Sequence, residues 1–545
     1  MIIRKKLPRP KKLHEPLLHA DHPRPVTRRD FLSAGLIGSQ AVVVGSAGLF
    51  SLFGANKAHA TLATDIQSLK QQCGIQTAGA GKIPFIAFDL SGGANLNGSE
   101  VLIGGAGGQL DFLSTAGYNK LGLPGNMLPN SPNPGSATNN FISTALGLAW
   151  HSDGAILRGI LSKTATTTQA GTNGAVMAAM SQNDTQNNPH NPMYGIYTAG
   201  ADGALLPLIG TQASTSGGNS MAPATMINLS VLPTVIRRSQ DVTGLVNTGQ
   251  LGTMFSDPND TVSVLESVIR LSGGTNASTP SDKLGNVVIQ PGNAQTDAVL
   301  KSQMLCGYTK SAALVDTFGS PAALNPDLDT NIVGGANSIF TAAEYATGNV
   351  AMTAAVMKMV VNGFAGAGTI QLGGYDYHDS TRATGEGRNF AAGQLIGACL
   401  EYAARVGVPI MIYVFTDGSL SSTNMVDNST GGRGKFGWQG DNSSVAATFF
   451  LVYNPAGRAT LLDGAGGLPA ANHQQIGAYT SDGSVNTSAS PVSNSVTALA
   501  YSVVLNYMAL HGQQGNFASL FSQSGIASSQ IDQLTAFAPI VNGVI

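Results

Sequence analysis

Four side chains of the kinds that bind metal ions each lie at or just after the end of an apolar stretch of this chain. They are Asp89, Asp376, His378 and Asp417. Carboxylates that meet in one place repel each other, and a bound cation removes that repulsion. Aspartate combined with histidine suits Zn²⁺ or Mn²⁺. If the four residues meet, the pattern predicts a divalent metal site, with zinc or manganese as the ion.

A purely structural interpretation of the same residues stays open. Asp417 precedes Gly418, and aspartate before glycine is common in ordinary turns. Residues at strand ends are also often polar, whether or not they bind a ligand. The metal interpretation therefore depends on the four side chains converging.

The elements that must bring these residues together are apolar strands alternating with helices. Strands are expected at 83–90, 155–161, 369–372, 408–415 and 445–453. Helices are expected at 262–271, 295–318, 336–364, 389–406 and 495–511, and a loop entering a helix at 171–180. Strands that are apolar throughout belong to parallel sheets covered on both faces. We therefore expect an α/β fold with a mostly parallel central sheet, helices on both faces and a site at the carboxyl ends of the strands.

The composition fits a folded protein with long loops. The chain has 68 glycines and only 11% charged residues, while 43% of its residues are hydrophobic. That hydrophobic share supplies a core, and the Gly, Asn and Ser residues supply long loops. We expect residues 61–545 to form a single large α/β domain, in which the region 97–297 is rich in insertions.

The first sixty residues have the layout of a twin-arginine signal peptide. Arg28 and Arg29 are followed by Phe31 and Leu32, a Gly-punctuated apolar stretch follows, and Ala58-His59-Ala60 closes it. The glycines make this stretch only mildly apolar, so we expect cleavage and no stable transmembrane segment afterwards. The expected export partner is the twin-arginine translocase. The expected location is the periplasm or the extracellular space.

The charge of the remaining chain argues against nucleic-acid binding. Residues 1–60 hold 10 basic and 3 acidic side chains, which leaves 18 basic and 27 acidic ones and a net charge of −9. A mildly acidic protein without a basic patch is a poor ligand for nucleic acid.

The three cysteines are Cys73, Cys306 and Cys399, so at most one intramolecular disulfide forms. The pairing stays open on the sequence alone. Cys399 lies among apolar residues of an expected helix, which favours core packing. No CxxC spacing supports a zinc finger or a thioredoxin-type site.

The order of these motifs is similar to that of a known family. A twin-arginine signal, an early strand with a Gly-Gly loop, Gly373-Gly374-Tyr375-Asp376-Tyr377-His378, a helix, an apolar strand and Thr416-Asp417-Gly418 follow one another. This order resembles the domain of unknown function 1501 family, which is grouped with the alkaline phosphatase and sulfatase superfamily. The likeness is best over 369–453. It implies an alkaline phosphatase-like fold and a divalent metal site.

The resemblance also implies roles for single residues. Asp89 matches the metal ligand after the first strand, Asp376 and His378 match a second pair, and Asp417 matches a further aspartate. The nucleophile of the superfamily would fall near Thr172, with Asn173 and His190 close by in sequence. Gly418 stands where a ligand histidine is expected, and Asp441 is the residue that could replace a missing ligand. His473 lies further along the chain.

Two functions remain open. The first is a metal-dependent hydrolase that acts outside the cytoplasm on a small anionic ester, a phosphate or a sulfate. The second is a non-catalytic exported protein on the same fold that serves as a cell-envelope binding or assembly component. The low charge, the many loops rich in Asn, Ser and Thr, and the missing ligand histidines favour the second function. The chemistry that the resembled fold implies favours the first.

Overall fold

The computed structural model describes residues 62–73, 82–133, 135, 140–181, 188–245, 257–273, 283–318 and 321–541. The signal peptide expected at residues 1–60 lies outside them. The chain forms two compact units. Of the described residues, unit 1 holds 62–73, 257–273 and 283–318, and unit 2 holds the rest. The sequence pattern predicts one domain over residues 61–545 and does not separate unit 1.

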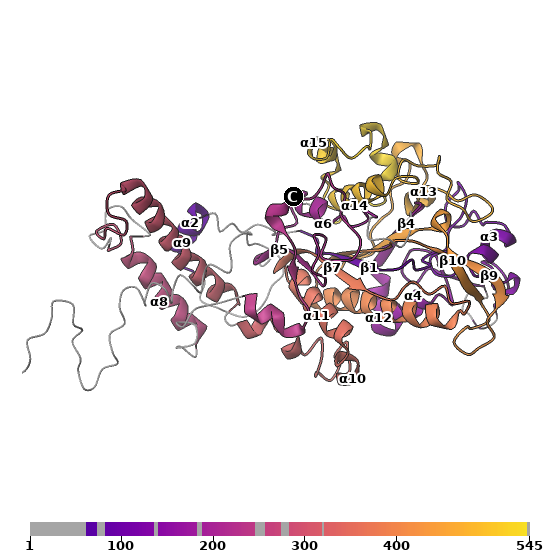
Figure 1. The fold of residues 1–545 in the computed structure, drawn as a ribbon, viewed down its shortest axis with the longest axis horizontal. Coiled ribbons are helices and arrows are strands. Elements are labelled where there is room, and N and C mark those ends of the chain that lie inside the picture. Colours follow the sequence, from indigo (N-terminus) through magenta and orange to yellow (C-terminus); the bar gives the residue numbers. More distant parts are fainter. Residues whose placement is uncertain are drawn as a thin grey trace, which may run out of the picture. The chain divides into compact units, whose positions relative to one another are not determined.

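Unit 1 is helical. It comprises α2 (Thr64–Gln72), α8 (Pro258–Leu271) and α9 (Ala294–Phe318), and α9 packs against both of the others (Figure 1). A disulfide joins Cys73 to Cys306, and the Arg270 guanidinium pairs with Asp65 at 2.8 Å. The expectation of at most one disulfide is confirmed.

Unit 2 is built on an eight-stranded sheet. In spatial order its strands are β12 (Gln475–Ile476), β4 (Thr172–Met177), β11 (Thr448–Tyr453), β8 (Ile410–Thr416), β1 (Phe85–Leu90), β7 (Ala365–Leu372), β5 (Leu206–Gly210) and β6 (Thr234–Val235). The strands β8, β1, β7, β5 and β6 are parallel, as are β12 and β4. The expected α/β fold with a mostly parallel sheet is confirmed.

One strand of the sheet departs from the parallel arrangement. β11 is antiparallel to both of its neighbours, β4 and β8. A parallel crossover needs a dozen or more residues and usually a helix. Between β8 and β11 the chain instead forms the hairpin of β9 (Leu420–Val426) and β10 (Phe436–Asp441) and then returns in the opposite direction.

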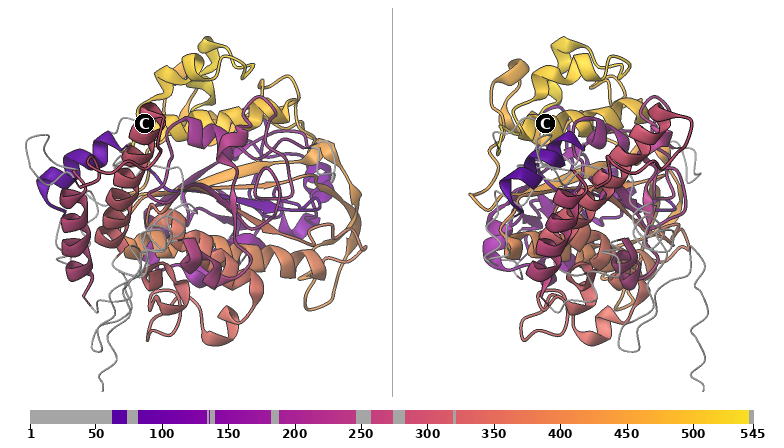
Figure 2. Two further views of the ribbon diagram at one scale, coloured as in Figure 1. Left: turned by 60° about the vertical axis from the view of Figure 1, so that its left-hand side comes forward. Right: turned by 90° about the vertical axis from the view of Figure 1, so that its left-hand side faces the viewer.

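Helices cover both faces of the sheet, as expected (Figure 2). On one face α11 (Gly348–Val361) contacts β7 and β1, α12 (Ala383–Val406) contacts β8 and β11, and α4 (Ala155–Lys163) packs along α12. On the other face α6 (Met193–Thr198) contacts β7 and β5, and α14 (Val496–Leu510) packs on α6. Shorter elements include α3 (Thr115–Lys120), α5 (Thr166–Ala170), α10 (Ala342–Tyr345), α13 (Ala470–Gln474), α15 (Phe517–Leu520), β2 (Ile142–Ser143) and β3 (Trp150–His151).

The main core lies between the sheet and α14. Phe85 and Ala87 of β1 belong to it together with residues of β8, β11 and α14. Because side chains alternate along a strand, Asp89 of β1 lies on this same α14 face. Cys399 is fully buried as a free thiol, which confirms core packing.

Two expected elements are wrong. Residues 155–161 form the helix α4 instead of a strand. Gly159 lets α4 pack closely on α12, because a Cβ on it would lie 2.3 Å from the Phe390 carbonyl oxygen. Residues 172–177 form the strand β4 instead of a loop leading into a helix, and every residue of that strand is buried. Short apolar segments do not distinguish helix from strand by their pattern alone.

None of the helices in the described part of the chain combines the length and the apolar character that crossing a membrane requires.

Candidate functional site

Asp89 and Asp417 form a buried pair at the carboxyl ends of β1 and β8. These strands are neighbours in parallel register, with Asp89 beside Phe415. Both carboxyl groups are fully buried. The side-chain amide of Asn219 donates to Asp417 Oδ2 at 3.3 Å, and its backbone N–H donates to Asp89 Oδ2 at 2.7 Å. The structure therefore brings these two predicted residues together, with Asn219 between them.

Hydrogen-bond donors surround this acidic pair. Asp89 Oδ2 also accepts from the Ser220 backbone at 2.8 Å, and Asp417 Oδ1 accepts from the Gly92 backbone at 2.7 Å. The loop after β5 brings Asn219 and Ser220 to this position. A Cβ on Gly218 in this loop would lie 2.7 Å from Asp89 Oδ2, so only glycine permits the approach. N–H groups of Gly92, Asn219 and Ser220 therefore contact the carboxylates that were expected to contact a cation.

Burial, together with the smaller effect of the nearby Asp417 charge, raises the pKa of Asp89 to about 7, although hydrogen bonds from Ser220 and Asn219 act in the opposite direction. Near neutral pH the pair therefore holds a proton for part of the time, which lessens the repulsion between the two carboxyl groups.

Asp376, His378 and Asp441 form a second cluster, which is exposed. Their ligand atoms all lie within 4.8 Å of one another, and no other group of three or more in the described part of the chain meets this condition. His378 Nε2 lies 2.6 Å from Asp376 Oδ1, with the two side chains 42% and 47% exposed. Asp376 and His378 follow β7, and Asp441 ends β10.

The predicted metal residues thus divide between two places at the same edge of the sheet. Asp89 and Asp417 are not part of the exposed cluster. Gly92 separates the two groups: its N–H bonds to Asp417, and a Cβ on it would lie 2.6 Å from the Asp376 backbone nitrogen. Asp441, named as the residue that could replace a missing ligand, does lie with Asp376 and His378.

Thr172 lies at the opposite edge of the sheet from both groups. It is the first residue of β4 and pairs with Tyr453 of β11, which in turn pairs with Ile410 at the start of β8. Asp417 follows the far end of β8, which is about 20 Å away at the usual rise per residue. The Thr172 hydroxyl donates to the Thr168 carbonyl at 2.7 Å. The predicted nucleophile is therefore not brought to the carboxylates.

The remaining residues named from the sequence are also buried. Asn173 donates to the Ala459 carbonyl, and both ring nitrogens of His473 contact carbonyl oxygens, those of Thr535 and Ala465. None of these contacts reaches the two acidic groups.

His190 alone among them lies near the strand ends. Its Nε2 lies 2.9 Å from the Ser181 hydroxyl, and its ring stacks on Phe415 of β8. Burial lowers the pKa of His190 to about 3, so the ring is neutral at physiological pH.

A buried ionic network, which the sequence does not predict, lies at the start of α12. Lys435 is fully buried and lies 2.8 Å from Glu386 Oε1 and 3.3 Å from Asp153 Oδ2. Arg382 pairs with Glu386 at 2.9 Å and lies over the Trp438 ring. These residues are scattered over 153–438 and follow no motif. The sequence offers one sign of the network, the opposite charges of Arg382 and Glu386 four residues apart, a spacing that allows an ion pair on a helix.

Glu100 connects this network to the exposed cluster. Its carboxylate accepts from the Ile156 backbone at 2.8 Å and from Asn389 at 2.9 Å, while burial and then the Glu386 charge raise its pKa to about 7. Asn389 accepts a hydrogen bond at 3.0 Å from the Tyr377 hydroxyl, which itself accepts from the Asn95 backbone. Tyr377 lies between Asp376 and His378 in sequence, so the network anchors the segment that carries two residues of the cluster.

Comparison of this chain with protein-family models, with curated proteins and with solved structures finds no match.

Proposed function

We propose that this protein is exported through the twin-arginine pathway and hydrolyses small anionic esters, phosphates or sulfates, with one divalent metal ion held by Asp376, His378 and Asp441. The observation that carries the proposal is the approach of their ligand atoms to within 4.8 Å of one another. Two carboxylates and one imidazole are a donor set that zinc or manganese accepts. Three protein ligands leave coordination positions for water and substrate.

In the part of the chain that the structure describes, one group of three ligand atoms is spaced to hold an ion. The carboxylates of Asp89 and Asp417 are fully buried and accept hydrogen bonds from Gly92, Asn219 and Ser220. A bound divalent ion lowers the pKa of a coordinated water and stabilises negative charge on the substrate. The protein residues hold the ligands in place: Tyr377 is fixed by Asn389 and Asn95, and the chain on either side of it carries Asp376 and His378.

A specific observation favours a second candidate function, a non-catalytic cell-envelope binding or assembly protein. Thr172, the expected nucleophile, begins β4 at the far edge of the sheet, and the buried Asp89–Asp417 pair is occupied by N–H donors. A chain with one exposed set of three ligands can bind an ion without catalysing hydrolysis.

Metal binding is the first measurement. The purified protein is stripped with a chelator and titrated with Zn²⁺ alone and with Mn²⁺ alone, and bound metal is quantified by mass spectrometry. We expect about one ion per chain, and affinity lower by roughly tenfold or more in Asp376→Asn and in His378→Gln. The matched control is Asp532→Asn, which changes an exposed carboxylate outside the cluster.

Hydrolysis is measured on the same samples with p-nitrophenyl phosphate and p-nitrophenyl sulfate. Metal-dependent release of nitrophenol that is lost in Asp376→Asn supports the hydrolase. An ion bound by the wild type without any turnover leads to the binding function instead. A protein that binds neither ion refutes both the metal site and the hydrolase.

A further inference from the structure

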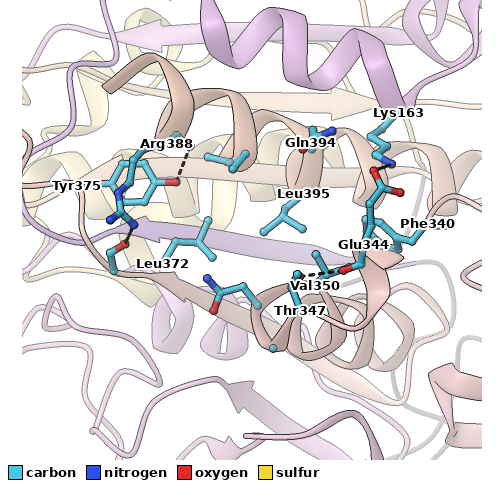
Figure 3. Close-up of a pocket in the computed structure, with 15 residues that line it drawn as sticks. Lys163, Phe340, Glu344, Thr347, Val350, Leu372, Tyr375, Arg388, Gln394 and Leu395 are labelled. Carbon is cyan, nitrogen blue, oxygen red and sulfur yellow. Dashed lines mark hydrogen bonds and ion pairs between the residues drawn. The ribbon is translucent and has the colours of Figure 1, made fainter. Parts of the chain in front are cut away.

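A pocket of about 480 Å³ lies between α11, α12 and the carboxyl end of β7 (Figure 3). None of Asp376, His378 and Asp441 lines it. Its volume lies in the range of sites that hold small organic ligands, about 300–1,000 Å³. Binding in this pocket is therefore independent of the proposed hydrolysis.

The middle of the pocket is apolar. Leu372 of β7 and Leu395 of α12 are buried there, and Val350 and Ala391 line it as well. In Figure 3 the side chains of Leu372, Leu395 and Val350 lie between the two polar ends. An apolar group placed on these side chains would leave water, which favours its binding there.

Arg388 lies at one end, beside Tyr375 (Figure 3). The structure gives its guanidinium one hydrogen bond, to the Gly373 carbonyl oxygen at 3.3 Å, and no ion pair with a carboxylate in the described part of the chain. The guanidinium lies against Gly374, where a Cβ would approach it to 2.6 Å. A guanidinium has five N–H donors in a fork that matches a carboxylate. This end of the pocket therefore keeps donors available for an anion.

The other end is already neutralised. Lys163 pairs with Glu344 at 2.6 Å and lies over the Phe340 ring. Because Glu344 already balances the charge of Lys163, this end of the pocket does not attract a further anion. The Phe340 ring adds to the apolar surface of the pocket. The pocket therefore has one electropositive end and an apolar remainder.

We propose that this pocket binds a small molecule in which one carboxylate is attached to an apolar chain or ring. The carboxylate pairs with Arg388, and the apolar part lies on Leu372, Leu395 and Val350 toward Phe340.

The test uses octanoate as the probe and 1-octanol as its uncharged counterpart. Binding to the purified full chain is measured by titration calorimetry in the presence of a chelator, so that the exposed acidic cluster plays no part. We expect the wild type to prefer octanoate. Arg388→Gln is expected to weaken octanoate binding by roughly tenfold or more, because a charge-assisted hydrogen bond is lost, and to leave 1-octanol binding unchanged.

Two further variants distinguish binding in the pocket from non-specific binding to the protein surface. Ala391→Phe places a large ring on an exposed position of α12 at the pocket and is expected to reduce binding of both probes. Arg237→Gln removes an exposed positive charge that does not line the pocket, and is expected to bind as the wild type does. Melting temperatures confirm that each variant is folded.

Three results would overturn the proposal. These are no octanoate binding at millimolar concentration, equal affinity for octanoate and 1-octanol, and an Arg388→Gln affinity equal to that of Arg237→Gln. Because a chelator is present, none of these results bears on the proposed metal site.

Discussion

The backbone N–H of Gly92 donates to the Asp417 carboxylate at 2.7 Å, across the ends of two neighbouring parallel strands. Gly92 has a φ of +119°, and a Cβ on it would lie 2.6 Å from the Asp376 backbone nitrogen. One residue without a side chain thus holds the buried acidic pair on one side and the segment of the exposed cluster on the other.

Replacing Gly92 is therefore expected to disturb both groups. Gly92→Ala should lower the free energy of unfolding by about 1–3 kcal/mol, because alanine is strained at this φ and its Cβ displaces Asp376. Zn²⁺ affinity should fall with it. Urea denaturation and Zn²⁺ titration measure the two effects.

The control is Gly387→Ala within α12, where a Cβ meets no heavy atom within 4 Å. This variant should be as stable as the wild type or more stable by about 0.5–1 kcal/mol. Equal stability of Gly92→Ala and the wild type would contradict the argument from close approach.

Asp89 should make stability depend on pH in a defined window. Its pKa is about 7 in the folded protein and near 3.9 in an unfolded chain, so the folded state binds the proton more tightly. The stabilisation that Asp89 gains from this tighter proton binding is fully present below about pH 4 and is lost as the pH rises through about 7. Asp89→Asn should remove this dependence, since its amide oxygen can accept from Asn219 and Ser220.

Chemical denaturation at several pH values between about 4 and 8 measures this effect as the difference between wild type and variant. Between about pH 4 and 8 the free energy of unfolding of the wild type should fall by roughly a few kcal/mol more than that of Asp89→Asn. Asp532→Asn should follow the wild type. A constant difference between wild type and Asp89→Asn across the window would rule out the raised pKa.

The buried Lys435 should matter far more than a surface lysine. Lys435→Met leaves Glu386 and Asp153 buried with fewer cations around them, and breaking a buried ion pair in this way costs about 3–5 kcal/mol. Lys120→Met removes an exposed pair with Asp482 at 3.4 Å and should cost less than about 1 kcal/mol. Urea denaturation of both variants measures the two losses in free energy of unfolding. Similar losses would argue against a stabilising role for the buried network.

Thiol reactivity should follow the arrangement of the cysteines. Cys399 is buried, and burial raises the pKa of its thiol, which keeps it protonated and unreactive. A thiol reagent should therefore find no reactive group in the native protein, one after denaturation and three after denaturation with reduction. A second free thiol in the denatured, unreduced protein would mean that Cys73 and Cys306 are not joined.

The sequence predicts the part of the fold that rests on local pattern. The apolar runs of β1, β7 and β8 are long enough to be read as buried strands, and parallel neighbours necessarily place Asp89 and Asp417 at one edge. The sequence predicts the strand β11 but not its antiparallel direction, because an apolar strand has the same pattern in either direction.

The division of the site could not be predicted in the same way. Asp89 is buried because Asn219 and Ser220, about 130 residues away, bring N–H donors to it, and no local pattern signals that loop. Asp376 and His378 lie several residues beyond the end of β7, where strand alternation no longer sets the direction of a side chain. The helix Ala155–Lys163 is not predicted because a short apolar segment fits a helix or a strand equally well, and its close packing on α12 through glycines leaves no local signal.

The Cys73–Cys306 bond closes a loop in which the two cysteines are 233 positions apart. The strands β1, β4, β5 and β6 all lie inside this loop, whereas β7, β8, β11 and β12 lie outside it. A protease cut anywhere between the two cysteines therefore leaves two polypeptides that still migrate as one species until a reductant separates them. After a cut between β6 and Cys306, this bond in unit 1 is the covalent link between the two halves of the sheet in unit 2.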